Sequence, residues 1–353
     1  MKKHADRPAY RRVFGIGCLM AGTVGVVCLT TGLLCAHAGG QRTAAPLSVE
    51  GLPLGEDYPY GSPLSAAIRP DGKVVYAAQH TGRRVDVVNP LAKKILASIP
   101  IGATPSGLAL DALRNRLFVT CGQAEGEIVV IDTNTQRIDG VLPAGHTPVA
   151  PVISADGRVL FVCNRFDNEV VAYDVEKRTV RSRIAVAREP IAAALTPDGA
   201  MLVVAHHLPS QAANGNQVAA KVDLIDTVSL GIIASVSLPN GSTGVRELCV
   251  SPDGRFAYVP HTLGRFGVPT TQVERGWMNT SVLSIVDLGN RCWLTTVLLD
   301  DVELGAANPW GVACTADGRS IVVAHSGTHE LSLIDRQALH AKIDRAASGE
   351  QAG

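Results

Sequence analysis

The residues best suited to chemistry in this sequence are histidines. A neutral imidazole ligates transition metals, and a catalytic zinc site takes about three such protein ligands. Five histidines are candidate ligands because a repeat fold could bring them toward one axis: His206, His207, His261, His325 and His329. Three interpretations compete, namely a transition-metal site, a docking surface for a redox partner, and polar loop residues without a special role.

Aromatic, cationic and polar residues complete the expected binding face. They are Arg265, Arg275, Trp277, Asn279, Trp310 and Glu330. Tryptophan and arginine anchor many protein interfaces, which favours docking. The alternative is that the tryptophans only hold long loops in place. Glu330 is a candidate carboxylate for a metal-dependent enzyme, either a hydrolase of the lactonase type or an oxidoreductase.

Sequence motifs of established catalytic sites are missing. There is no G-x-S-x-G, Walker loop or H-E-x-x-H motif. None of the five cysteines after residue 38 is spaced as C-x-x-C, which excludes the haem-attachment motif. Buried thiols are expected at these cysteines, and a disulfide framework is the alternative. The 32 basic and 32 acidic residues balance, so charge gives no reason to expect nucleic acid or an anionic membrane surface as a partner.

A repeat positions these candidates. Tyr76, Phe118, Phe161 and Val203 lie in similar apolar segments that are 42, 43 and 42 residues apart. Across the chain, five segments of this kind follow an Asp-Gly pair, at Asp71, Asp156, Asp198, Asp253 and Asp317. Asp-Gly supplies the positive φ of a tight hairpin, and Asn or Asp recurs at the turn after the next strand. Four short strands in about 42 residues are typical of a β-propeller blade.

The repeat predicts an all-β fold, a β-propeller of about six four-stranded antiparallel blades, with a seven-bladed relative as the alternative. The last unit shows three strands, followed at residues 337–353 by a short tail that we expect to be helical or disordered. A Leu-Pro-x-Gly ending recurs before the first complete unit, at residues 52–55. We therefore expect residues 46–54 to supply the missing strand of the last blade, paired with the strand around residues 331–335.

Blade geometry sorts the candidate residues by face. Loops between second and third strands share one end of the ring with the connections between blades; we call this end the loop face. The Asp-Gly hairpins lie at the opposite end, the hairpin face. Seven of the eight histidines after the N-terminal segment map to the loop face, as do two insertions at about residues 208–220 and 263–280. The loop face is therefore the expected functional surface.

Blade segments such as residues 251–259, Ser-Pro-Asp-Gly-Arg-Phe-Ala-Tyr-Val, resemble the YVTN repeat family. Residues 261–266, 269–272 and 274–279 resemble bacterial proteins in which such a propeller precedes a di-haem cytochrome c peroxidase-like module. That resemblance implies a periplasmic cytochrome or another redox protein as partner. The chain departs from it by containing no C-x-x-C-H motif.

The N-terminus predicts export. A basic region with Arg11 and Arg12 precedes an uncharged apolar stretch at residues 13–35 and the small residues Ala36 and Ala38. This order is typical of a signal peptide over residues 1–38, by the Sec or the twin-arginine route. An uncleaved N-terminal anchor is the alternative. We therefore expect a periplasmic or otherwise extracytoplasmic propeller over residues 39–336.

The sequence as a whole favours a binding or interaction scaffold, accessory to a redox partner and without catalytic activity of its own. The alternative is a metal-dependent enzyme that uses the histidines of the loop face.

Overall fold

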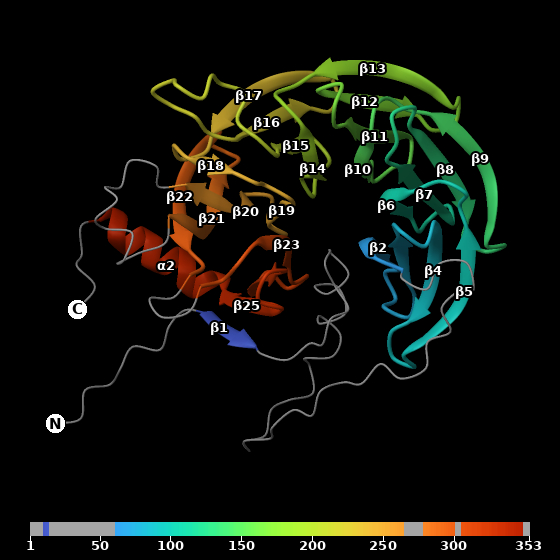
Figure 1. Ribbon diagram of the computed structural model, residues 1–353, viewed down its shortest axis with the longest axis horizontal. Helices are drawn as coiled ribbons and strands as arrows, with labels where there is room; N and C mark the ends of the chain where they lie inside the picture. The colour runs from blue at the N-terminus through green and yellow to red at the C-terminus, as the bar shows by residue number, and fades with distance from the viewer. Residues whose placement is uncertain (1–9, 14–60, 265–277, 301–304, 349–353) are drawn as a thin grey trace.

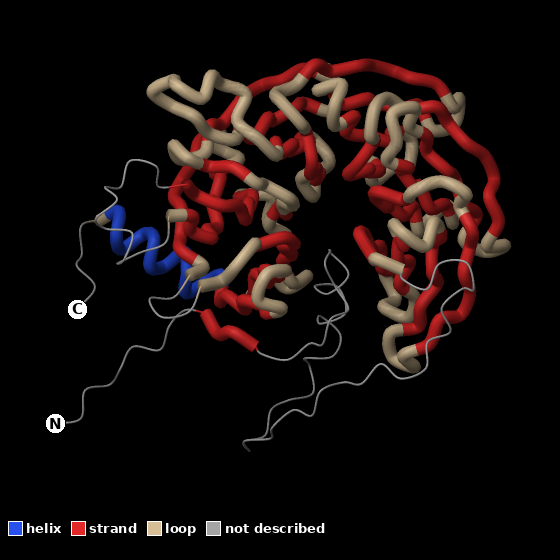
Figure 2. The backbone as a smooth tube through the Cα atoms, in the orientation of Figure 1, coloured by secondary structure: helices blue, strands red, loops and turns tan. Residues whose placement is uncertain are grey.

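The computed structural model describes residues 10–13, 61–264, 278–300 and 305–348. Its strands form six antiparallel sheets, set radially around a central axis (Figure 1). Strand is the dominant structure, and one helix lies outside the ring (Figure 2). The predicted six-bladed β-propeller is confirmed.

The first three blades each contain four consecutive strands, from the axis outward. Blade one has β2 (Pro63–Ile68), β3 (Val75–Gln79), β4 (Arg84–Asn89) and β5 (Lys94–Pro100). Blade two has β6 (Pro105–Asp111), β7 (Arg116–Cys121), β8 (Glu127–Asp132) and β9 (Arg137–Pro143). Blade three has β10 (Pro148–Ile153), β11 (Val159–Asn164), β12 (Glu169–Asp174) and β13 (Thr179–Ala185).

Blade four follows the same plan, and blades five and six depart from it. Blade four is regular, with β14 (Pro190–Leu195), β15 (Met201–His206), β16 (Lys221–Asp226) and β17 (Gly231–Ser237). Blade five has a divided inner strand, with β18 (Ser242–Thr243), β19 (Cys249–Val250), β20 (Phe256–Gly264), β21 (Asn279–Asp287) and β22 (Cys292–Leu298). Blade six has β23 (Pro309–Cys314), β24 (Ser320–His325), β25 (Glu330–Asp335) and β1 (Tyr10–Val13).

Local turn chemistry builds each blade. The five glycines of the Asp-Gly pairs have φ between 65° and 71°, a region that favours glycine. The turns after the third strands use the expected side chains: Asp132 Oδ1, for example, accepts hydrogen bonds from the backbone N–H groups of Asn134 and Thr135. These contacts involve residues a few positions apart, which explains why the sequence predicts the hairpins well.

Packing between blades supplies the core. Second strands such as β11 are buried on both faces, whereas outer strands such as β13 are mostly exposed. Five apolar clusters join the consecutive blades from one to six. A smaller cluster of Val322, Ala324 and Leu331 lies on the face of blade six that points away from blade five. Apolar burial on both sides of each sheet holds the ring together.

An N-terminal strand completes blade six, but it is not the predicted one. β1 pairs antiparallel with β25, with Tyr10 opposite Ile334 and Val13 opposite Leu331. The prediction that residues 46–54 occupy this edge is therefore wrong, and those residues lie outside the described part of the chain. The error has a physical cause: the edge is recognised through backbone hydrogen bonds, which any extended segment can make.

The C-terminal helix α2 (Arg336–Ala347) packs on the outside of blades five and six (Figure 1). Asp335 caps its N-terminus by accepting from the Ala338 N–H at 2.8 Å. Leu339 joins the apolar cluster between these blades, and His340 Nε2 lies 2.7 Å from the Tyr258 hydroxyl. Within the described residues, no helix has the length and apolar character that crossing a bilayer requires.

Candidate functional site

In four of the six blades, the innermost strand points one side chain toward the axis through a β-bulge. In β2, β6, β14 and β23 the pairing with the second strand skips one residue directly after the first proline. A bulge redirects the side chain that it releases. The released residues are Leu64, Ser106, Ile191 and Trp310. All of them line one central cavity.

Blade five places charge at the same level. Its innermost strand is interrupted between β18 and β19, so residues 244–248 make no ladder with β20. Arg246 stands seven residues before Asp253, as Ile191 stands before Asp198 and Trp310 before Asp317. The interruption turns both Arg246 and its neighbour Glu247 into the cavity wall.

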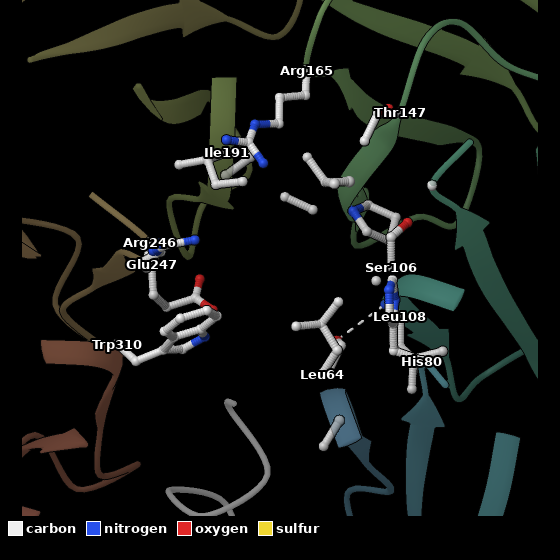
Figure 3. Close-up of a pocket in the computed structure, with 18 residues that line it drawn as sticks. Leu64, His80, Ser106, Leu108, Thr147, Arg165, Ile191, Arg246, Glu247 and Trp310 are labelled. Carbon is white, nitrogen blue, oxygen red and sulfur yellow. Dashed lines mark hydrogen bonds between the residues drawn. The ribbon is translucent and has the colours of Figure 1, made fainter. Parts of the chain in front are cut away.

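The cavity has a volume of about 400 Å³ and lies on the axis. Residues that directly follow second strands, including His80 and Arg165, also line it, so it opens at the loop face. Leu64, Leu108 and Ile191 contribute apolar lining, and Arg165, Arg246 and Glu247 extend into the cavity from other blades (Figure 3). A largely apolar cavity with a few convergent polar groups is typical of ligand sites.

Two arginines dominate its electrostatics. The Arg246 guanidinium carbon lies 4.4 Å from the centre of the Trp310 ring, a cation–π contact. Burial and the nearby charge of Arg165 lower the pKa of Arg246 below its usual value. Arg165 donates to Glu189 Oε2 from Nη2 at 2.9 Å and from Nε at 3.2 Å. The Arg165 charge is thus paired with the Glu189 carboxylate, whereas the Arg246 charge lies over the aromatic ring of Trp310.

Glu247, the neighbour of Arg246 in the chain, also extends into the cavity (Figure 3). Loss of hydration through burial raises its pKa to about 7, against a small opposing effect of the Leu248 N–H. Its carboxyl group is therefore largely protonated in mildly acidic solution. In this form it can donate a hydrogen bond as well as accept one.

His206, one of the candidate metal ligands, is instead part of a buried hydrogen-bonded chain. Its Nε2 lies 2.9 Å from Asp223 Oδ2 in the next strand of the same blade. Ser235 donates to Asp223 Oδ1 at 2.6 Å from the strand after that. Burial alone would raise the pKa of Asp223, but the hydrogen bond and charge of His206, with Ser235 and the Ala187 N–H, hold it below its usual value.

His261 and His325 repeat this arrangement in blades five and six. His261 Nε2 lies 2.8 Å from Ser284 Oγ, which lies 2.7 Å from Thr296 Oγ1. His325 Nε2 lies 2.8 Å from Ser332 Oγ. Burial lowers the pKa of His261 to about 4, so its imidazole is neutral at physiological pH. Each of these three histidines therefore forms a hydrogen bond between the second and third strands of its own blade, and the three blades are different.

The other two candidate histidines have different environments. His207 is buried, and its Nδ1 lies 2.6 Å from the Val245 carbonyl, to which an N–H there donates. Burial, followed by the charges of Arg246 and Arg165, lowers its pKa. His329 is exposed in the turn between β24 and β25. Among the residues that the structure describes, no three histidine, cysteine or acidic side chains are placed to hold a metal ion.

The remaining predicted residues divide by position. Trp310 lines the cavity, Asn279 is exposed at the start of β21, and Glu330 is partly buried at the start of β25. Arg265, Arg275 and Trp277 lie outside the described residues. Sequence analysis missed Arg165, Arg246 and Glu247. A signal for Arg246 existed, because it shares the seven-residue spacing from an Asp-Gly pair with the axial residues of other blades.

Comparison with known proteins identifies a relative with the same architecture. Hydrazine synthase subunit beta of Kuenenia stuttgartiensis is 25% identical over 114 residues, which are 32% of this chain and 29% of that protein. A solved chain of Kuenenia stuttgartiensis hydrazine synthase superposes with a TM-score of 0.74 at 19% identity, covering 85% of this chain and 83% of the other. The chain is a β-propeller similar to hydrazine synthase subunit beta.

A more distant structure has the same fold. A chain of the mitotic checkpoint complex superposes with a TM-score of 0.59 at 16% identity, covering 77% of this chain and 74% of that one. No protein-family model matches the sequence. At these identities the structural likenesses show the fold alone. The sequence match spans less than a third of the curated relative.

Proposed function

We propose that this protein is an exported β-propeller that serves as a binding subunit of a multi-subunit redox enzyme. The observation that carries the proposal is the sequence and fold similarity to a protein whose name identifies it as an enzyme subunit. The YVTN-type repeats and the resemblance to propellers that precede a cytochrome-like module support a cytochrome as the partner. The N-terminal pattern expected for a signal peptide supports a location of the assembly outside the cytoplasm.

The loop face is the docking surface in this proposal. Phe166 is 47% exposed there, in the turn between β11 and β12. The Arg165 guanidinium carbon lies 4.9 Å from the Phe166 ring centre, and the His146 ring meets it edge-on at 5.1 Å. An exposed aromatic ring fixed by two neighbours loses little conformational entropy when a partner covers it.

The alternative function, a metal-dependent enzyme, requires several imidazoles around one point. His206, His261 and His325 instead direct Nε2 to the third strands of their own blades. This arrangement favours binding over metal-dependent chemistry at these residues.

Affinity purification of the tagged protein from the extracytoplasmic fraction of its own host tests the proposal. We expect a stoichiometric partner that carries covalent haem, visible by haem staining and by its Soret absorbance. Phe166→Ala should reduce the recovered partner by about tenfold. Leu113→Ala is the matched control, because Leu113 is an equally apolar side chain that is 82% exposed on the hairpin face.

Two outcomes contradict parts of the proposal. Recovery of the protein alone, without a stoichiometric partner, rejects the subunit role. Loss of the partner in Leu113→Ala but not in Phe166→Ala rejects the loop face and assigns docking to the hairpin face.

A further inference from the structure

The axial cavity contains a cationic group, Arg246, that no carboxylate of the described residues neutralises. Two arginines, Arg165 and Arg246, line it. One carboxylate, Glu189, accepts from Arg165 and also lies 3.3 Å from Arg188 Nε. In the described parts of the chain, no carboxylate lies within salt-bridge distance of Arg246. Charges in half-buried positions normally have a partner of opposite sign, because loss of hydration is costly.

We propose that the cavity binds a small organic acid, with its carboxylate at Arg246 and its apolar body against Leu64 and Ile191. A guanidinium presents a planar fork that matches the two oxygens of a carboxylate. The Trp310 ring packs against one face of the Arg246 guanidinium, and this contact fixes the orientation of the guanidinium before a ligand binds. This site is separate from partner docking at Phe166, so either proposal can fail without the other.

The shape of the cavity favours an organic acid over an inorganic anion. Its volume of about 400 Å³ exceeds what a single oxyanion fills. Bound phosphate would leave the apolar lining of the cavity exposed to water, whereas the hydrocarbon chain of an organic acid would cover it. Below about pH 7, Glu247 is mostly protonated and adds a hydrogen-bond donor next to Arg246 without adding negative charge.

Titration calorimetry of the purified protein, free of partner, tests this site with succinate, acetate and inorganic phosphate as probes. We expect saturable binding of succinate with one site per chain. Arg246→Gln should weaken it by about tenfold or more, since a charge-assisted bidentate contact is lost. Arg319→Gln is the matched control, because Arg319 is an exposed arginine on the hairpin face.

The variants must be compared as folded proteins, so each is checked by thermal unfolding without ligand. If Arg246→Gln folds poorly, Trp310→Phe is the second variant to test. It keeps an aromatic ring beside Arg246 and should retain most of the succinate binding. Equal succinate affinity in the parent and in Arg246→Gln overturns the site. Phosphate binding as tight as succinate binding overturns the organic part of the proposal, and no saturable heat with any probe overturns all of it.

A second observation concerns the inner strands of blades five and six. Cys249 in β19 and Cys314 in β23 place their sulfur atoms 3.6 Å apart, although 65 residues separate them in the chain. Both pack against the apolar cluster between these blades. A disulfide needs the sulfurs about 1.5 Å closer, a shift that side-chain rotation can supply.

We infer that Cys249 and Cys314 form a disulfide that joins blade five to blade six when the protein meets a disulfide oxidant. The Cys314 thiolate attacks one sulfur of the oxidant and releases its first thiol. The Cys249 sulfur then displaces the second, so that two cysteine thiols are oxidised and one external disulfide is reduced to two thiols. The hydrogen bond from Cys249 lowers the pKa of Cys314, which favours Cys314 as the attacking sulfur.

Incubation of the folded protein with oxidised glutathione, followed by alkylation and peptide mapping, tests this link. A Cys292→Ser background prevents dimers through the exposed Cys292. We expect a peptide joined through Cys249 and Cys314, and a melting temperature higher by about 5 °C than that of the reduced protein.

Cys314→Ala should show neither the joined peptide nor the increase in melting temperature. Cys163→Ala removes a buried cysteine of another blade and should keep both effects. Glutathione adducts on Cys249 and Cys314 without a joined peptide would overturn the inference, as would a joined peptide that lowers the melting temperature.

Discussion

Histidines at one repeat position carry much of the polar structure between blades. His206 and His325 are the last residues of second strands, and His261 lies at the same position within the longer strand β20. The other blades have Gln79, Cys121 and Asn164 at this position. Each histidine bonds a third-strand side chain inside an otherwise apolar interface. Buried polar groups stabilise a fold when they are paired and destabilise it when one partner is removed. These residues are therefore expected to affect folding.

His206→Ala tests this role. Removing the imidazole leaves the buried Asp223 carboxylate without its main partner, so the free energy of unfolding should fall by about 3 kcal/mol. Urea unfolding followed by circular dichroism measures the change. His329→Ala, at an exposed turn, should change it by less than about 0.5 kcal/mol. Equal effects of the two substitutions would contradict the structural assignment of His206.

Glu247 predicts a pH dependence of stability. Its folded pKa of about 7 lies above the ordinary value of 4.5. The unfolded chain therefore loses this proton first as the pH rises. The contribution of Glu247 is complete below about pH 4.5 and is lost as the pH rises through about 7. Between pH 5 and pH 8 the loss should be about 1–3 kcal/mol.

Glu247→Gln removes this titration while keeping a similar shape. We expect the variant to lose less stability than the parent between pH 5 and pH 8 in urea unfolding, and to be the more stable protein at pH 8. Parallel pH profiles for the two proteins would show that the Glu247 carboxyl group is not held protonated by its surroundings.

At the scale of elements, helix α2 is part of the fold of blades five and six. Arg336 Nε donates to the Tyr258 hydroxyl at 2.9 Å, and Arg336 also pairs with Asp253. With His340 and Leu339, these contacts tie the helix to two blades. A chain that ends after Asp335 should therefore unfold at a lower temperature, by about 5 °C or more.

A chain that ends after Ser348 is the matched control for this truncation, since it keeps the whole helix. Differential scanning calorimetry of both chains measures the effect. The same melting temperature for both would show that α2 adds nothing to the stability of the ring.

The sequence predicts the elements better than the site. Asp-Gly pairs specify hairpins through φ angles of one or two residues, and Asp or Asn caps turns two or three residues away. The cavity depends instead on bulges and on the interrupted strand of blade five. Arg246 and Glu247 face the axis because β20 does not pair with them, a property of the sheet and not of their immediate neighbours.

The histidines show what the sequence could not predict. The sequence predicts His206, His261 and His325 on one face of the ring, whereas the structure places them at a repeated position between strands of three blades. The sequence alone could not distinguish imidazoles that meet at an axis from imidazoles that bond within three separate sheets, because both arrangements have the same spacing.

At the scale of the whole molecule, export remains a prediction with a direct test. The mature protein from its own host should begin at Gly39, which intact mass determines. Replacing Arg11 and Arg12 by lysine keeps the positive charge but removes the twin-arginine motif. Unchanged export of this variant would assign the Sec route, and cytoplasmic retention the twin-arginine route. An intact N-terminus in the membrane fraction would contradict cleavage and favour an anchor.

If export removes residues 1–38, the pairing of β1 with β25 implies that the ring closes in two stages. Residues 10–13 belong to the segment whose removal export predicts, so cleavage after residue 38 would vacate the edge of β25. A vacant edge is a template for any extended chain. In the precursor the leader would act as a placeholder that shields this edge from premature association. In the mature protein a different segment, or a neighbouring molecule, would have to take over, and blade six would be completed last.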